Sequence, residues 1–199
     1  MKILLTAFCP FGGDCLNASQ EVMDALPERL EGLYIEKLLL PVSFRSAPRI
    51  AIDAAERLRP DAIVCLGQAG GRDAVTPERA ALNVMDAAQP DNDGFQPVDE
   101  PVVRGGPAAF FSTLPVKAMV EAIARSGVPA RLSDSAGTYV CNCLMYALLH
   151  WTRTGGHDVP CGFLHLPYLE QQRRGGAPAL QKDRAVCAVA AALRVLECM

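Results

Sequence analysis

The hydrophobic positions of this chain form two different patterns, continuous runs and helical repeats. Lys2–Phe8, Asp61–Leu66 and Cys161–Leu166 are mainly apolar runs of strand length, and Leu33–Pro41 is a fourth run of this kind. Such runs are typical of strands buried on both faces of a parallel sheet. Between them, apolar residues recur at helical spacing. The alternation predicts a single domain over residues 1–199 with a three-layer α/β/α fold. In this fold a mostly parallel, twisted sheet lies between two layers of helices.

Helix start and stop signals mark the limits of the helical segments. We predict helices at Asn17–Leu26, Ser46–Leu58, Pro115–Arg125 and Leu180–Leu196, and a further helix through Leu144, Ala147 and Leu148. Ser46 is the expected N-cap of its helix, because serine accepts hydrogen bonds from the first backbone N–H groups. Two shorter segments, Arg79–Val84 and Val128–Leu132, have the apolar content of strands.

One long segment does not fit this alternation. Pro90–Thr113 contains Pro-Asp-Asn-Asp-Gly and Arg-Gly-Gly-Pro, and it is longer than an ordinary connection. A long irregular loop in a compact domain is commonly a lid, a binding loop or an oligomer contact. An unspecialised surface excursion is the alternative interpretation.

Composition narrows the range of partners. The net charge is -3, with Lys and Arg scattered along the chain, which argues against nucleic acid or an anionic membrane as the main partner. The apolar run at the amino terminus is too short for a secretory signal and lacks a small-residue cleavage site. These features favour a cytoplasmic location, where thiols stay reduced.

The sequence contains eight cysteines. In a reducing compartment we expect most of them to be small core residues, as at Cys65, Cys161 and Cys187, which lie inside apolar patterns. Cys141 and Cys143 form a C-x-C pair, but no second pair of ligands accompanies them. We therefore predict no zinc or other metal site.

Cys141 is the strongest candidate for a nucleophile. The small residues of Ser133–Thr138 form a predicted turn that leads into a helix, so Cys141 should lie within one turn of the helix N-terminus. Unpaired N–H groups and the positive end of the helix dipole favour a thiolate there. The alternative is that Cys141 is another buried and unreactive cysteine.

Ligands of open α/β sheets bind at the carboxyl ends of the strands. The residues there include Phe8-Cys9-Pro10-Phe11-Gly12-Gly13 and Gly67-Gln68-Ala69-Gly70-Gly71-Arg72. The second stretch matches neither a dinucleotide fingerprint nor a Walker loop, so a nucleoside- or phosphate-handling enzyme has only glycine content in its favour. His150 is expected in the core and His157 in a solvated turn. Only His165 ends a strand.

A thiol nucleophile needs a base within reach, and the base needs an acid that orients it. Cys141 begins a helix and His165 ends the strand that follows, which places both at the same rim of the sheet. The residues alone leave the orienting acid open among Glu78, Asp86, Asp134 and Asp73.

At these positions the chain resembles the pyroglutamyl peptidase I family of cysteine peptidases, also called pyrrolidone-carboxylate peptidases. The matching motifs are Thr6-Ala7-Phe8-Cys9-Pro10-Phe11-Gly12-Gly13, Gly67-Gln68-Ala69-Gly70-Gly71-Arg72 followed by Pro77-Glu78-Arg79 and Asn83, Ser135-Ala136-Gly137-Thr138-Tyr139-Val140-Cys141-Asn142 and Phe163-Leu164-His165-Leu166-Pro167-Tyr168. The resemblance implies Glu78 as the orienting acid of the Cys141, His165 and Glu78 triad. It also implies a cytosolic homotetramer that uses no cofactor and removes an amino-terminal pyroglutamyl residue from peptides through a thioester.

The resemblance also implies a binding site for the pyroglutamyl ring. Its apolar walls are expected at Phe8, Phe11, Tyr139 and Val140, and its amide-reading groups at Gln68 and Asn17. This composition suits a compact, uncharged ring that lacks a free amine. Plain core packing is the alternative for each aromatic residue.

One position departs from the family pattern. Where the family commonly reads D-A-R-x-P-D, with an arginine that polarises the scissile carbonyl, this chain reads Asp86-Ala87-Ala88-Gln89-Pro90-Asp91. Loss of one oxyanion donor typically costs about 10²–10³ in turnover. We expect Gln89 or the backbone N–H of Cys141 to take its place. The alternative is a weak or inactive protein that binds pyroglutamyl peptides.

Overall fold

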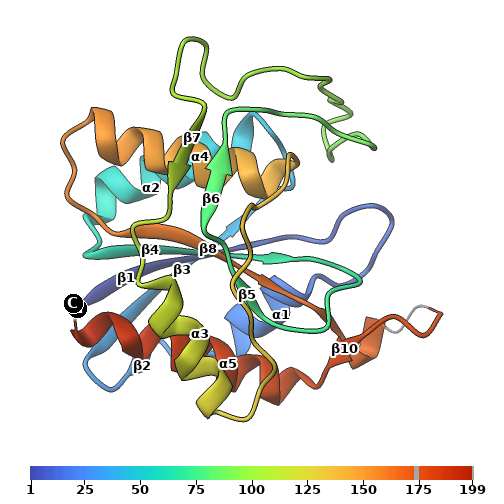
Figure 1. The fold of residues 1–199 in the computed structure, drawn as a ribbon, viewed down its shortest axis with the longest axis vertical. Coiled ribbons are helices and arrows are strands. Elements are labelled where there is room, and N and C mark those ends of the chain that lie inside the picture. The colour runs from blue at the N-terminus through green and yellow to red at the C-terminus, as the bar shows by residue number, and fades with distance from the viewer. Residues whose placement is uncertain (173–174, 199) are drawn as a thin grey trace.

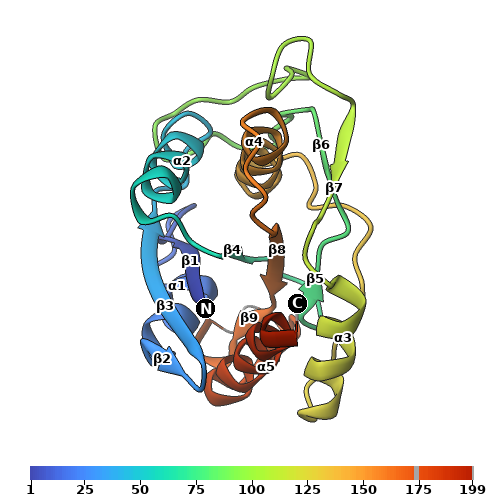
Figure 2. The same ribbon diagram turned by 90° about the vertical axis from the view of Figure 1, so that its left-hand side faces the viewer.

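The computed structural model describes residues 1–172 and 175–198, and these form three layers (Figure 1). Helices α2 (Ser46–Leu58) and α4 (Val140–Thr154) cover one face of the central sheet. Helices α1 (Ala18–Ala25), α3 (Val116–Arg125) and α5 (Lys182–Arg194) cover the other face (Figure 2). The three-layer α/β/α prediction is confirmed.

The central sheet has the strand order β2-β3-β1-β4-β8-β5. Its strands are β1 (Lys2–Phe8), β2 (Arg29–Leu30), β3 (Leu33–Leu40), β4 (Ala62–Gln68), β5 (Thr76–Pro77) and β8 (Cys161–Leu166). The four inner strands run parallel, and only the short outer strands β2 and β5 are antiparallel. Because helices bury both faces, β4 and β8 contain almost no exposed residue, which explains their continuous apolar pattern.

Four short strands lie outside the central sheet. An antiparallel ribbon joins β6 (Ala80–Leu82) to β7 (Ala109–Phe111), and a parallel pair joins β9 (Tyr168–Leu169) to β10 (Ala179–Leu180). Two 3₁₀ turns, η1 (Glu170–Gln172) and η2 (Val195–Cys198), complete the described elements.

Two predicted strands are wrong in extent or place. Only Ala80–Leu82 of the Arg79–Val84 segment is a strand, and it pairs with β7 because β5 already occupies the edge beside β8. The Val128–Leu132 segment makes a single bridge, between Ala130 and Val75. Pro129 accepts the Val75 N–H but has no N–H to donate, so the ladder does not continue toward Val128.

Two local expectations also need correction. Ser46 is the first residue of α2 rather than its N-cap, and the Ser43 hydroxyl accepts the Ser46 N–H at 3.0 Å. Cys187 is exposed on α5 rather than buried. The seven cysteines whose side chains the structure describes are all free, as expected, and Cys65, Cys143 and Cys161 are buried.

The long Pro90–Thr113 segment is held in place by hydrogen bonds. The amide of Asn83 donates to the carbonyl oxygens of Val103 and Gly106 and accepts from the N–H of Val103. The buried Asp91 carboxylate accepts three backbone N–H groups, including that of Phe44 at 2.9 Å. The segment therefore has one defined course above α2 and α4 (Figure 1).

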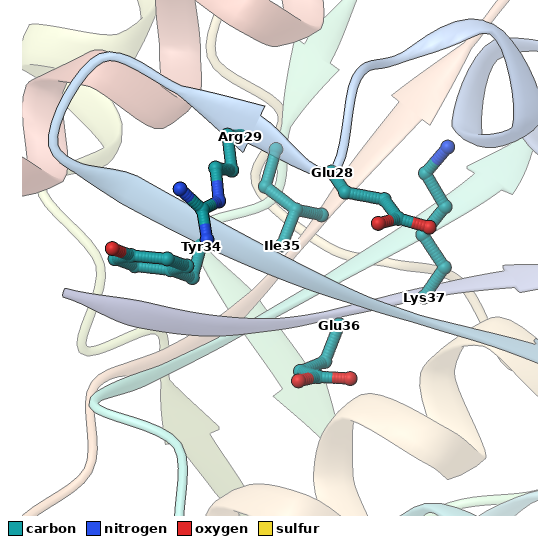
Figure 3. A pocket seen from close by; sticks show the side chains of 6 residues that line it. All are labelled: Glu28, Arg29, Tyr34, Ile35, Glu36 and Lys37. Atoms are coloured by element: carbon teal, nitrogen blue, oxygen red, sulfur yellow. The ribbon is translucent and has the colours of Figure 1, made fainter.

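The β2–β3 edge of the sheet carries a pocket of about 370 Å³ (Figure 3). The Arg29 guanidinium stacks 4.8 Å from the centre of the Tyr34 ring, and Lys37 donates to the Asp24 carbonyl oxygen at 3.1 Å. A lysine that covers an edge strand in this way opposes pairing with another chain.

The described part of the chain contains neither a membrane-spanning helix nor a cluster of metal ligands. Every helix in it is too short or too polar to cross a lipid bilayer. Over the same residues, no three His, Cys, Asp or Glu side chains gather closely enough to hold a metal ion.

Candidate active site

Cys141 is the second residue of α4, which confirms its predicted place at a helix N-terminus. Gly137 takes a left-handed conformation with φ of 84°, and Tyr139 then caps the helix with extended backbone. A glycine is needed at the first of these positions because other side chains rarely adopt a positive φ. The turn therefore delivers Cys141 to the carboxyl rim of the sheet.

The thiol of Cys141 packs directly against the backbone of β4. A Cβ atom at Gly67 would lie 3.0 Å from Cys141 Sγ and 2.7 Å from the Phe163 ring, so only glycine leaves room for both. In the sheet register, Gly67 pairs with His165 on β8. Cys141 on α4, packed against β4, and His165 on the adjacent strand β8 thus lie at the same rim, as their positions in the sequence predicted.

His165 is buried and hydrogen-bonded to Glu78. Its Nδ1 lies 2.7 Å from Glu78 Oε1, and the two residues are 4% and 0% exposed. The antiparallel strand β5 brings Glu78 there, and the Glu78 N–H donates to the Phe163 carbonyl oxygen at 2.9 Å. An ionised carboxylate accepts the Nδ1 proton, which leaves Nε2 free to act as a base.

The other three candidate acids lie elsewhere. Asp134 is 90% exposed and pairs with Arg79, and Asp73 pairs with Arg131 on the surface. Asp86 is exposed and is linked to Thr138 through backbone groups. Geometry alone therefore selects Glu78.

Arg72 is a component of the site to which the sequence assigned no role. Its Nη1 donates to Glu78 Oε1 at 2.6 Å and also to the Thr76 hydroxyl. One carboxylate oxygen thus receives both the arginine and His165. A buried carboxylate that stays charged requires a counter-charge. The signal in the sequence was therefore the arginine six residues before Glu78.

The site favours an ionised carboxylate and a neutral imidazole. Burial alone would raise the pKa of Glu78, but its hydrogen bonds with His165, Ser133 and Arg72, and its attraction to the imidazolium form of His165, hold that pKa below the usual value. Burial lowers the pKa of His165 and outweighs the opposing effect of Glu78, while the Arg72 charge lowers it further. Because Arg72 is always charged, Glu78 stays ionised beside a neutral imidazole.

The predicted thiolate at the helix N-terminus is not supported. Burial raises the pKa of Cys141 to about 12, and the negative charge of Glu78 acts in the same direction. Arg72 and a hydrogen bond from the backbone N–H of Cys141 oppose this shift but are smaller. Desolvation of this partly exposed thiol therefore opposes the thiolate more strongly than the helix terminus favours it.

The predicted apolar residues divide into two groups. Phe11 and Tyr139 are partly exposed, and their ring centroids lie 6.3 Å apart. Phe8 and Val140 are 2% and 0% exposed and belong to the core beneath α2 and α4. Phe44, which the sequence did not single out, packs edge-on against Tyr139 at 5.2 Å.

The two predicted amide-reading residues also differ in their contacts. The side chain of Asn17 is the N-cap of α1: its Oδ1 accepts from Ser19, and its Nδ2 donates to the Cys9 carbonyl oxygen at 3.0 Å. Gln68 ends β4, and its Oε1 accepts the Ala18 N–H at 2.8 Å. Both residues therefore hold the start of α1 beside the carboxyl rim.

The Ala88–Gln89 segment is anchored at both ends. Thr138 donates its hydroxyl proton to the Asp86 carbonyl oxygen at 2.7 Å, and the Tyr139 hydroxyl donates to the Pro90 carbonyl oxygen at 3.0 Å. Both residues of the segment are exposed. The Gln89 amide nitrogen lies 3.8 Å from the position of a Cβ on Gly12, next to the loop that carries Phe11.

A thiol, an imidazole and a buried carboxylate at the carboxyl rim of an α/β sheet define a cysteine-dependent hydrolase. The pyroglutamyl peptidase family model matches residues 1–197, so the chain belongs to that family.

Named relatives and solved structures agree with this assignment. The chain is 46% identical to a pyrrolidone-carboxylate peptidase of Thermococcus kodakarensis over 92% of this chain and 86% of the relative. It is 43% identical to pyrrolidone-carboxylate peptidase 1 of Caldanaerobacter subterraneus over 98% of each chain. The crystal structure of pyroglutamyl peptidase I from Bacillus amyloliquefaciens superposes with a TM-score of 0.93 at 41% identity, over 96% of this chain and 94% of that one.

Proposed function

We propose that this protein is a cysteine exopeptidase that removes an amino-terminal pyroglutamyl (5-oxoproline) residue from peptides. The observation that carries the proposal is the packing of Cys141 Sγ on Gly67, whose register partner on β8 is His165, with its Nδ1 hydrogen-bonded to Glu78. Membership of the pyroglutamyl peptidase family gives the substrate class.

The first half of the reaction is acyl transfer to the thiol. His165 Nε2 takes the Cys141 proton while Sγ attacks the carbonyl carbon of the pyroglutamyl residue. The tetrahedral intermediate then collapses, the C–N bond breaks, and the imidazolium gives its proton to the leaving amine. The products of this half are a thioester and a peptide shortened by one residue.

The second half is hydrolysis of the thioester. Neutral His165 takes a proton from water, the resulting hydroxide attacks the thioester carbonyl, and the C–S bond breaks. The imidazolium returns the proton to sulfur, and pyroglutamic acid leaves. Glu78 stabilises the imidazolium in both halves, and the raised pKa of the Cys141 thiol implies that proton transfer accompanies attack.

Recognition of the ring uses apolar walls and amide groups. We propose Phe11 and Tyr139 as the walls that contact the ring, with Phe8 and Val140 behind them in the core. Gln68 is proposed to read the ring amide. The capping contacts of Asn17 support a positioning role, in which it fixes the start of α1 beside Gln68.

Polarisation of the scissile carbonyl is proposed to use the backbone N–H of Cys141 together with Gln89. Ala88 has no side chain that can donate, whereas Gln89 carries an amide and lies beside the loop of Phe11. Gln89 is exposed, and a donor that is not held in place stabilises the oxyanion less than a fixed one does.

The assay is release of coumarin from pyroglutamyl-aminomethylcoumarin by the purified protein. We expect turnover by the wild type and a loss of at least about 10³-fold in Cys141→Ala, with unchanged thermal stability, because the attacking atom is gone. Turnover that survives in Cys141→Ala contradicts the assignment of the nucleophile. Calorimetric binding of a pyroglutamyl peptide without any turnover by the wild type indicates a binding protein instead.

The remaining expectations concern assembly and location. We propose that the enzyme acts in the cytoplasm as a homotetramer on peptide substrates and without a cofactor. Light scattering of the purified protein tests the tetramer, because a tetramer has four times the monomer mass of 21.3 kDa. A purely monomeric protein that retains activity contradicts this part.

A further inference from the structure

The side-chain amide of Gln172 has one possible orientation. Its Oε1 accepts the Leu169 N–H at 3.0 Å, and its Nε2 donates to the Leu16 carbonyl oxygen at 3.0 Å. Backbone N–H groups only donate and carbonyl oxygens only accept, so the two ends of this amide cannot be exchanged. The second hydrogen of Nε2 is donated to Gln68 Oε1 at 2.8 Å.

The orientation of Gln172 in turn determines that of Gln68. Gln68 Oε1 accepts from Gln172 and from the Ala18 N–H, each at 2.8 Å. If the Gln68 amide rotated by half a turn, its own N–H₂ group would face these two donors. Gln68 Nε2 therefore points away from both, and within the described residues no protein group accepts its hydrogens.

Gln68, which carries this free Nε2, lies at the carboxyl rim of the sheet. Gln68 is the last residue of β4 and follows Gly67, against which Cys141 Sγ packs. Gln172 ends the segment that begins with β8 and carries His165. The same stretch of chain thus supplies the base and the residue that orients Gln68.

We propose that Gln172 is a positioning residue that makes Gln68 present an N–H₂ donor to the lactam carbonyl oxygen of the pyroglutamyl ring. This inference rests on the proposed function. The lactam carbonyl is the group that distinguishes a pyroglutamyl ring from a prolyl ring, and a donor fixed in advance recognises it without reorganisation. A freely rotating glutamine would present its oxygen to the carbonyl part of the time.

The central test is Gln172→Glu, measured by the kcat and KM for pyroglutamyl-aminomethylcoumarin. The carboxylate puts an oxygen against Gln68 Oε1, which favours the rotated Gln68 amide. We expect KM to rise about tenfold with kcat nearly unchanged, because the ring carbonyl is bound alike in the ground state and the transition state. Gln171→Glu is the matched control, because it makes the same charge change at the exposed neighbouring position of η1.

A double-mutant cycle separates positioning from a general structural role. In a Gln68→Leu background, Gln172→Glu should cause no further rise in KM, because the residue through which it acts is missing. Gln172→Met keeps the volume without the amide and serves if the glutamate variant does not fold; it should raise KM severalfold.

Two outcomes overturn the proposal. One is an unchanged KM in folded Gln172 variants, and the other is a rise in KM on Gln172→Glu that is as large in the Gln68→Leu background as in the wild type. Activity of the wild type and of Gln171→Glu in the same assay keeps these outcomes distinct from failure of the proposed function. A protein without any wild-type turnover contradicts the proposed function, and a turning-over wild type with KM unaffected at Gln172 contradicts only the positioning role.

Discussion

The two sides of the candidate site are built differently. The proton-transfer side, formed by Cys141, His165 and Glu78, is closely packed, and Arg72 bonds to the same carboxylate oxygen as the imidazole. The carbonyl side, the Ala88–Gln89 segment, is exposed, and within the described residues its side chains make no hydrogen bond. The chain thus keeps the proton-transfer side intact while its carbonyl side departs from the family pattern. Substitutions on the first side should therefore have larger effects than those on the second.

The largest of these effects is expected for Glu78→Gln. The amide cannot stabilise an imidazolium, and it leaves Arg72 without its carboxylate. We expect kcat to fall by about 10²–10⁴-fold with little change in KM, measured on pyroglutamyl-aminomethylcoumarin. Asp134→Asn is the control, because Asp134 is exposed and pairs with Arg79. An unchanged kcat in Glu78→Gln would show that Glu78 does not assist proton transfer by His165.

Gly67→Ala should come next. The added methyl group would lie 3.0 Å from Cys141 Sγ and 2.7 Å from the Phe163 ring, so the thiol or the ring has to move. A displacement of about 1 Å of a reacting atom typically costs about 10²-fold in kcat. Thermal unfolding of Gly67→Ala, measured beside that of the wild type, separates displacement of the thiol from a general loss of stability. A crystal structure of the active Gly67→Ala enzyme with its thiol in place would contradict this account.

Arg72→Gln tests how the proton-transfer side is tuned. Burial lowers the pKa of His165 most, and the Arg72 charge lowers it further. Loss of that charge raises the pKa of His165, and the free enzyme needs a neutral imidazole. The acidic limb of kcat/KM should therefore move to higher pH, as measured between about pH 4 and 8. Arg131→Gln, which removes a surface arginine paired with Asp73, should leave the limb unchanged.

The smallest effect is expected on the carbonyl side. Gln89→Leu keeps the size of the side chain and removes its donor, so kcat/KM should fall about tenfold with unchanged thermal stability. Ala88→Arg should lower kcat if Gln89 already fills this space, and raise it if the site simply lacks a donor. Unchanged kinetics in Gln89→Leu would show that this side of the site contributes no side-chain donor.

The parts of the molecule that were predictable depend on local patterns. The buried strands could be read because both of their faces are covered, and Cys141 and His165 could be paired because each ends or begins an element at the same rim. The predicted strand at Val128–Leu132 is wrong because Pro129 has no N–H with which to extend the single bridge at Ala130. The apolar content of the segment, on which the prediction depended, does not reveal this. Glu78 needed the family resemblance, since β5 reaches β8 only in the folded chain.

Other features depend on contacts between distant residues and could not be predicted. Gln172 is 104 residues from Gln68, and no short motif links them. The state of Cys141 depended on a competition: the helix terminus favours the thiolate, but burial of the thiol is the larger effect. The amount of burial follows from the packing of Gly67 and Phe163, which the sequence pattern does not reveal.

The contact between Cys141 and Gly67 also limits which covalent inhibitors can fit. On the side of β4, the sulfur atom has no space even for one methyl group. An electrophilic reagent must therefore approach sulfur from the side away from the sheet and keep its bulk there. Reagents with a slim warhead joined to a lactam ring meet this requirement, whereas warheads that are branched at the reacting carbon should react slowly at Cys141 and leave it unmodified.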